Sequence, residues 1–106
     1  MTDKQLVLTT CGSADEARRI AEELVGRRLA ACVSIIPQVE AVYRWKGEVE
    51  HATEWLLVIK TTANAFESLR DVLSKLHSYD VPECVAITVA DGSPAYLQWI
   101  ANSVAE

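Results

Sequence analysis

Cys11 and His77 are the two side chains whose types and expected positions best suit metal chemistry. Cys11 ends a predicted strand and directly precedes a predicted helix, where unpaired amides and the helix macrodipole favour a thiolate. His77 stands where a second predicted helix ends. A thiolate and an imidazole are ligands that suit copper or zinc. The pair therefore predicts a site for copper or another divalent cation, and a weak one, because two ligands do not complete a coordination shell.

Structural interpretations of the same residues remain open. Cys11 can be a small apolar residue at a strand end, and His77 can be a cation that caps a helix C-terminus. Cys32 and Cys84 lie in apolar strand segments, which is typical of core cysteines, and the sequence has no CxxC pair. His51 is expected to be an interface histidine rather than a ligand.

A second group of residues is a candidate site for a small polar ligand. Arg44 and Trp45 stand beside a predicted turn, where a guanidinium and an indole can stack on or clamp a ligand. Lys60 and Glu83 are expected either to pair near a sheet edge or to bind such a ligand. These four residues are the candidate contacts of a small-molecule sensor, and their packing against a neighbouring subunit is the alternative.

Further polar motifs predict no reaction. Glu48, Glu50 and Glu54 share one strand face, and such acids usually form a solvated edge that also limits aggregation. No Ser-His-Asp grouping, GxGxxG motif or phosphate loop occurs, because the four glycines stand alone. The sequence therefore does not predict an enzyme.

These residues are positioned by alternating strand and helix patterns. Apolar periodicity predicts a strand over 6–11, a helix over 13–28, strands over 29–45 and 48–61, a helix over 62–77, a strand over 81–89 and a helix from 93. This order gives one α+β domain over 1–106, a ferredoxin-like βαββαβ sandwich with a long central hairpin and an extra C-terminal helix. In that arrangement the first strand and the second helix end at the same sheet edge, so Cys11 and His77 should lie on the same side.

Two features predict a homo-oligomer. The helices cover one sheet face, whereas segments such as 29–36 and 55–59 are apolar on both faces. The segment 29–45 would also reach roughly 55 Å if unbroken, whereas a compact domain of this length has a radius of gyration of about 13 Å. Other copies of the chain are therefore expected to cover the open face and the hairpin. The alternative is that Pro37 folds the hairpin back as a local flap.

Composition excludes other classes of partner. The 106 residues carry Lys+Arg 10 and Asp+Glu 15, so the net charge is 10 − 15 = −5, and no basic run favours nucleic acid or an anionic membrane. No segment approaches the roughly 18 apolar residues of a spanning helix, and no export signal is recognised. Three cysteines leave one over in any disulfide scheme, which favours a reducing cytoplasm.

Several segments together resemble the CutA family of divalent-cation tolerance proteins. The resemblance runs from about Leu6 to Ser103 and is carried by Leu29-Ala30-Ala31-Cys32-Val33, Ile36-Pro37, Tyr43-Arg44-Trp45-Lys46-Gly47-Glu48, Ile59-Lys60-Thr61-Thr62, His77-Ser78-Tyr79-Asp80-Val81-Pro82-Glu83 and Tyr96-Leu97-Gln98-Trp99. It implies a ferredoxin-like subunit in a tight homotrimer, with long hairpins that pair between chains as in PII signalling proteins.

The resemblance also implies tolerance of copper and other divalent metals and a copper site at Cys11 and His77. Leu76 stands where family members can carry a second histidine, and Ser78 and Asp80 replace the family's proline and glutamate. Three functions follow as hypotheses: a cytoplasmic metal-binding homotrimer, a PII-like sensor of a small molecule that signals to a protein partner, and a scaffold without a ligand.

Overall fold

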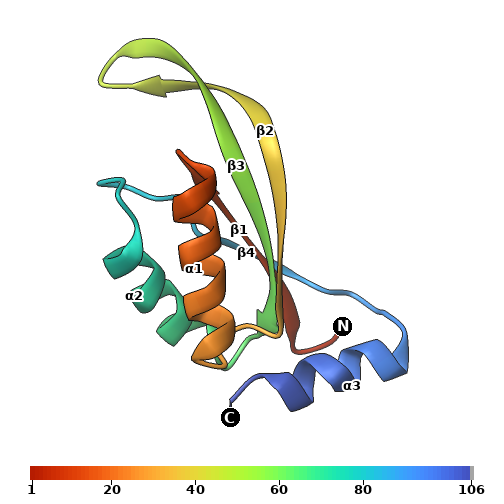
Figure 1. The fold of residues 1–106 in the computed structure, drawn as a ribbon. Coiled ribbons are helices and arrows are strands. Elements are labelled where there is room, and N and C mark those ends of the chain that lie inside the picture. The colour runs from red at the N-terminus through yellow and green to blue at the C-terminus, as the bar shows by residue number, and fades with distance from the viewer. Residues whose placement is uncertain (106) are drawn as a thin grey trace.

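The structure is a computed structural model that describes residues 1–105. In chain order its elements are β1 (Lys4–Cys11), α1 (Ala14–Gly26), β2 (Cys32–Trp45), β3 (Glu48–Thr62), α2 (Phe66–Leu76), β4 (Val85–Thr88) and α3 (Pro94–Ser103). The strands form one antiparallel sheet in the order β2-β3-β1-β4 (Figure 1). This topology confirms the predicted α+β, ferredoxin-like fold.

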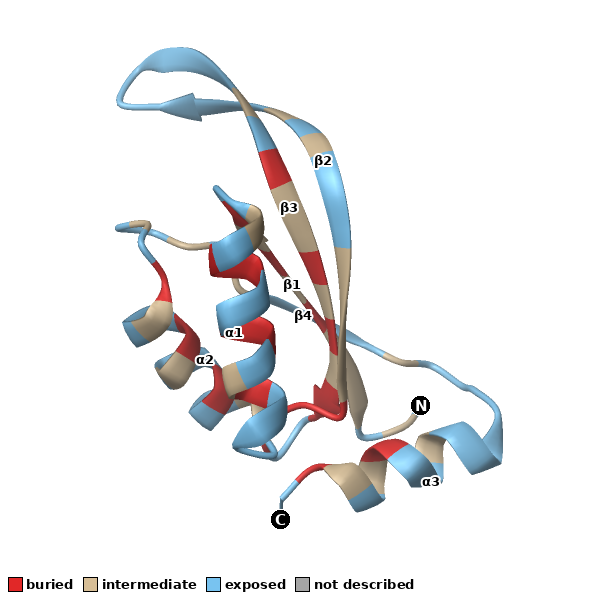
Figure 2. Cartoon of the chain, viewed as in Figure 1, coloured by how far each residue is buried: buried red, intermediate tan, exposed pale blue. Residues whose placement is uncertain are grey.

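The core lies between one face of the sheet and the helices α1 and α2, where Figure 2 shows most of the buried residues. Alternation along the strands and the helical period place these aliphatic side chains on the facing surfaces. The fully buried members of the core include Val7, Leu57 and Ile59 from the sheet and Ile20, Leu24, Leu69 and Leu73 from the helices. Each such side chain stabilises the fold by roughly 1.5–3 kcal/mol.

The hairpin of β2 and β3 extends beyond the rest of the sheet, as predicted. Pairing between β1 and β3 ends at Cys11 and Trp55, whereas β2 and β3 remain paired as far as Trp45 and Glu48. The register shifts between Ile36 and Val39, next to Pro37, which has no amide to donate. The hairpin curves over the N-terminal end of α1 (Figure 1), and the longest dimension of the chain is 44 Å.

The last strand is shorter than predicted. The sequence pattern indicated a strand over 81–89, whereas β4 pairs with β1 only over Val85–Thr88. Pro82 lacks the amide that a longer ladder would need. On the face away from α1 and α2, the side chains of Val85 and Ile87 are exposed, so the open face that the sequence predicted is present in the single chain.

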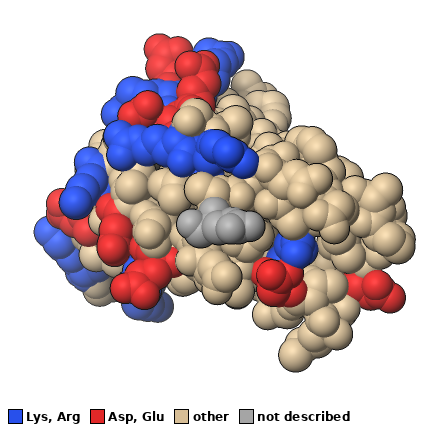
Figure 3. All heavy atoms as spheres, turned by 90° about the horizontal axis from the view of Figure 1, so that it is seen from below, with Lys and Arg blue, Asp and Glu red and all other residues tan. Residues whose placement is uncertain are grey.

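The C-terminal helix α3 lies across the end of the sheet, near the C-terminal end of α1 (Figure 1). Ser93 caps it and Pro94 begins it, as predicted. Ile100 and Val104 pack in a small cluster with Ala31 and Ala65. Charged side chains gather on the α1 and α2 side of the molecule seen from below (Figure 3), whereas α3 contains none. No helix within residues 1–105 is long and apolar enough to cross a membrane.

Candidate functional site

The end of β1 and the end of α2 bring Cys11 and His77 together. The Cys11 Sγ atom lies 3.9 Å from His77 Nε2, although the two residues are 66 positions apart in the sequence. Cys11 is 0 % exposed and His77 is 8 % exposed. The prediction that both residues lie at the same edge of the sheet is therefore confirmed.

Two hydrogen bonds fix the His77 ring. The ring accepts at Nδ1 from the backbone amide of Tyr79, at 3.1 Å, and Nε2 lies 2.7 Å from the carbonyl oxygen of Thr10. Because an amide can only donate and a carbonyl can only accept, these partners assign the hydrogen to Nε2. The ring is therefore the neutral Nε2–H tautomer, which donates to β1.

The environment of Cys11 differs from the thiolate expected at a helix N-terminus. Burial, together with the nearby carboxylates of Glu16 and Glu54, raises the pKa of the Cys11 thiol to about 12. The favourable field of α1 does not compensate for complete loss of solvation. The expectation of a stabilised thiolate is wrong for the free chain, in which Cys11 is a protonated thiol.

Glu16 joins the start of α1 to the loop after α2. Its backbone amide donates to the Ser13 Oγ cap at 3.1 Å, while its carboxylate accepts from the amides of Gly12, at 3.4 Å, and Ser78, at 2.8 Å. Burial would raise the pKa of this carboxyl, but the hydrogen bonds from Ser78 and from the Gly12 amide favour the carboxylate, and the pKa is lowered. Its Oε2 atom lies 3.8 Å from His77 Nδ1.

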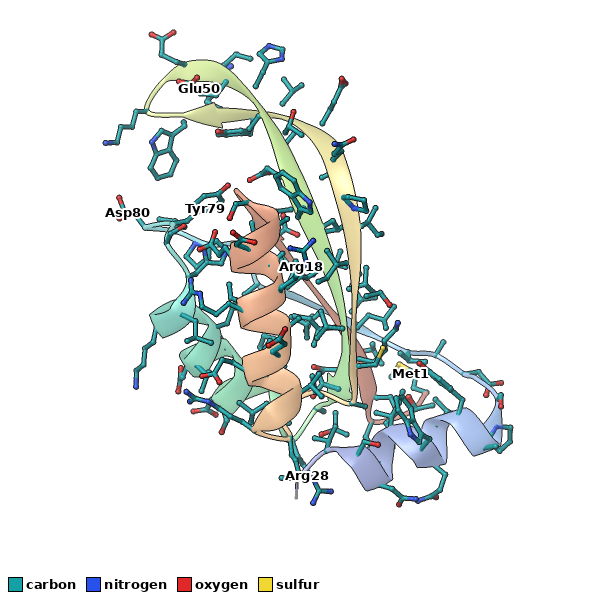
Figure 4. The ribbon with its side chains drawn as sticks, viewed as in Figure 1. Met1, Arg18, Arg28, Glu50, Tyr79 and Asp80 are labelled. Atoms are coloured by element: carbon teal, nitrogen blue, oxygen red, sulfur yellow. The ribbon has the colours of Figure 1, made fainter. Side chains whose placement is uncertain are left out.

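Tyr79 connects the same loop to the hairpin. Its hydroxyl donates to Glu54 Oε2 at 2.6 Å, and the Glu54 residue is only 7 % exposed. The prediction of a solvated acid is therefore wrong for Glu54, whereas Glu48 and Glu50 are exposed. In Figure 4, Tyr79 and Asp80 lie in the loop below Glu50 at the hairpin tip.

Gly12 makes room for this contact. A Cβ atom at Gly12 would lie 3.2 Å from the Tyr79 hydroxyl oxygen, which is tighter than an ordinary contact.

Sequence reasoning missed Glu16, Glu54 and Tyr79 as members of the cluster. The one local signal was the Ser13-to-Glu16 capping spacing, which does not indicate that the carboxylate also binds the Ser78 amide.

The second candidate group is not gathered within one chain. Arg44 and Trp45 lie at the hairpin tip, where the Arg44 Nη1 atom donates to the Gly47 carbonyl at 3.3 Å. Lys60 lies near the other end of β3, paired with Cys32, and its ammonium donates to Ser34 Oγ at 2.8 Å. Glu83 precedes β4, and no ion pair joins it to Lys60 within the described chain.

The Cys11 and His77 pair has the right spacing to share a metal ion. Metal–sulfur and metal–nitrogen bonds of about 2.3 and about 2.0 Å add up to more than the 3.9 Å between Sγ and Nε2, so one ion can contact both atoms. No three His, Cys, Asp or Glu side chains among residues 1–105 are grouped to hold a metal ion. An ion at this pair would have two protein ligands, would need further ligands from solvent or another copy, and would have to displace the Thr10 carbonyl from Nε2.

The sequence matches a known protein family over almost its whole length. The sequence model of the family described as "CutA1 divalent ion tolerance protein" matches residues 5–103. The "Divalent-cation tolerance protein CutA" of Thermus thermophilus is 47 % identical over 97 residues, which cover 92 % of this chain and 94 % of that protein.

Solved structures agree with these sequence matches. The structure of the Thermus thermophilus divalent cation tolerance protein has a TM-score of 0.94 at 45 % identity and covers 96 % of this chain and 99 % of that one. A protein from Archaeoglobus fulgidus, described as a periplasmic divalent cation tolerance protein, has a TM-score of 0.93 at 36 % identity, with 96 % and 99 % of the two chains covered.

Proposed function

Because the chain belongs to the CutA1 family of divalent ion tolerance proteins, we propose that it is a cytoplasmic homotrimer that binds copper or a related divalent cation through Cys11 and His77. The binding is weak, and it supports the response of the cell to metal ions. The 3.9 Å approach of Cys11 Sγ to His77 Nε2 is the observation that carries this proposal. A sulfur and an imidazole nitrogen at that spacing suit copper and zinc.

The protonation states of the two residues support weak binding. Cys11 binds a metal ion as a thiolate, so the ion must displace a proton from a thiol whose pKa is about 12. Leu76 occupies the position at which other family members are expected to carry a second histidine. The remaining ligands are water molecules or side chains of a neighbouring copy.

The open face of the sheet supports assembly into a homotrimer. Val85 and Ile87 are exposed on this face, and Tyr43 and Trp45 are exposed on the projecting hairpin. Soluble proteins rarely leave large contiguous apolar patches uncovered.

The cysteines support a cytoplasmic location. Cys11, Cys32 and Cys84 are all free, which supports a reducing compartment.

Copper titration calorimetry tests the metal site. Wild type is compared with the Cys11→Ala/His77→Ala double variant under reducing conditions at known protomer concentration. The matched control is Cys84→Ala/His51→Ala, which removes the same two residue types away from the pair. Loss of binding only in the Cys11/His77 variant supports the proposal. Equal binding in all three proteins, or binding in none, contradicts it.

A PII-like sensor of a small molecule is the second candidate function. The observation in its favour is Lys60, a partly buried ammonium that donates to Ser34 and has no carboxylate within ion-pair distance among residues 1–105. Arg44 and Trp45 of one copy would have to reach Lys60 and Glu83 of another. A ligand of the native state raises thermal stability, so a thermal-shift screen of metabolites, with Lys60→Gln as control, tests this alternative.

A further inference from the structure

The projecting part of the hairpin, residues 39–54, has few contacts with the rest of the chain, and we call it the arm. Pairing between β1 and β3 ends at Cys11 and Trp55, so the arm is a two-stranded ribbon that only its own ladder holds together. Such a ribbon is marginally stable when nothing packs against it. The direction of the arm therefore depends on the backbone at its base and on any contact that it makes with the body.

The base of the arm is a break in the ladder between β2 and β3. The register shifts between Ile36 and Val39, so that Pro37 and Gln38 of β2 lie opposite Trp55 alone. Pro37 has no amide to donate, and Gln38 has a φ of 58°, in the left-handed region. A bulge of this kind bends a strand and interrupts its hydrogen bonds. The ribbon therefore changes direction here at a lower cost than at a regular pair.

One side-chain contact holds the arm against the body. The Tyr79 hydroxyl donates to Glu54 Oε2 at 2.6 Å. Within residues 1–105 this is the one side-chain hydrogen bond between the arm and the rest of the chain, and no ion pair joins the two. Because the Glu54 carboxylate is largely buried, loss of this donor would leave a buried acceptor without its partner.

The other end of Tyr79 is fixed to the body. Its amide donates to His77 Nδ1 at 3.1 Å, and the centroids of the two rings lie 4.7 Å apart. His77 Nε2 donates to the Thr10 carbonyl on β1, and the adjacent Ser78 amide donates to Glu16 on α1. The Tyr79 hydroxyl therefore reaches the arm from a fixed support.

We propose that the arm moves about the bulge at Pro37 and that the Tyr79 hydroxyl is a latch that holds it against the body. While the latch is closed, the exposed side chains of Tyr43 and Trp45 are presented in one direction. In the homotrimer proposed above, on which this last step rests, the latch sets the direction in which the arm meets another copy. The latch itself needs neither a metal ion nor a second copy.

Hydrogen exchange of the backbone amides tests the latch in wild type and Tyr79→Phe, which removes only the hydroxyl. We expect the amides of the arm to exchange through a local opening that low urea concentrations do not accelerate. In Tyr79→Phe this exchange should be about 10-fold faster. If the arm exchanges only together with residues 57–61 of the core in both proteins, or at an unchanged rate in the variant, the proposal is overturned.

Gly12→Ala tests the latch without changing either of its two residues. The added Cβ would lie 3.2 Å from the Tyr79 hydroxyl oxygen, so the hydroxyl must shift by a few tenths of an ångström. Gly26→Ala is the matched control, because nothing lies within 4 Å of its added Cβ. We expect faster exchange of the arm in Gly12→Ala, by less than in Tyr79→Phe, and no change in Gly26→Ala.

Equal exchange of the arm in the two glycine variants would overturn the latch. Sedimentation of the same samples separates this result from failure of the proposed homotrimer. If wild type is monomeric, the homotrimer fails, and the exchange rates of the arm still decide whether Tyr79 holds it.

Discussion

The thiol of Cys11 is completely buried beside Glu16 and Glu54, and its pKa rises to about 12. An unfolded thiol ionises near a pKa of about 8.5, so between these values the unfolded chain binds fewer protons than the folded one. Stability must therefore fall as pH rises through this window. We expect the free energy of unfolding to drop by about 1–2 kcal/mol from pH 8 to pH 10, measured by urea denaturation.

The matching measurement on Cys11→Ala separates this residue from the other thiols. Without the Cys11 thiol, the free energy of unfolding should fall much less between pH 8 and pH 10. Both proteins are measured at the same protomer concentration. If the free energy of unfolding falls equally with pH in the two proteins, another group causes the loss of stability.

The hydrogen bond between Tyr79 and Glu54 predicts a second effect of a single residue. Tyr79→Phe leaves the largely buried carboxylate without its hydroxyl donor, and a buried group without a partner costs about 1–3 kcal/mol. The comparison is Tyr96→Phe on exposed α3, for which a change within about 0.5 kcal/mol is expected. Urea unfolding of both variants measures the difference. If the two are equally stable, the Tyr79 contact contributes nothing.

Residue patterns predicted part of this cluster, and physical reasons explain the remainder. Cys11 and His77 follow from topology, because the ends of a strand and a helix meet at one sheet edge. The contact between Tyr79 and Glu54 joins a loop to a strand 25 positions away, and no periodicity encodes it. Alternation predicted one shared face for Glu54, Glu48 and Glu50, but it could not show that a loop would cover Glu54.

The elements themselves followed the sequence closely where periodicity was strong. The helix α1 and the long hairpin formed as expected, because the Ser13 cap, the apolar stripe and a Lys46-Gly47 turn agree. The helix α2 begins at Phe66, four residues later than predicted, and its first turn has no side-chain cap. The prediction failed at β4, where apolar β-branched residues suggested a longer strand. Pairing depends on amides and on a partner strand, and Pro82 cannot supply the amide.

The start of α1 predicts an effect at the scale of one element. Ser13 Oγ accepts from the Glu16 amide, so Ser13→Ala should lower the free energy of unfolding by about 1 kcal/mol. Ser74→Ala makes the same change at an exposed position inside α2, where alanine is the better helix former, and should not destabilise. Denaturant unfolding compares the two, and similar losses would exclude a specific capping effect.

At the scale of the whole molecule, the proposed assembly depends on the face of the sheet that α1 and α2 leave open. Ile87 lies on this face and is 46 % exposed, and Val25, on the charge-rich helix α1, is 41 % exposed. Ile87→Lys would place an unpaired ammonium inside the proposed interface, at a cost of several kcal/mol that corresponds to more than about 100-fold weaker assembly.

Val25→Lys introduces the same side chain outside that interface, so it should leave assembly unchanged. Sedimentation at micromolar protomer concentration should show three chains per particle for wild type and Val25→Lys, and single chains for Ile87→Lys. A monomeric wild type would contradict the homotrimer itself. A trimeric Ile87→Lys would instead place the interface elsewhere, as on the projecting hairpin, where Tyr43 and Trp45 are exposed.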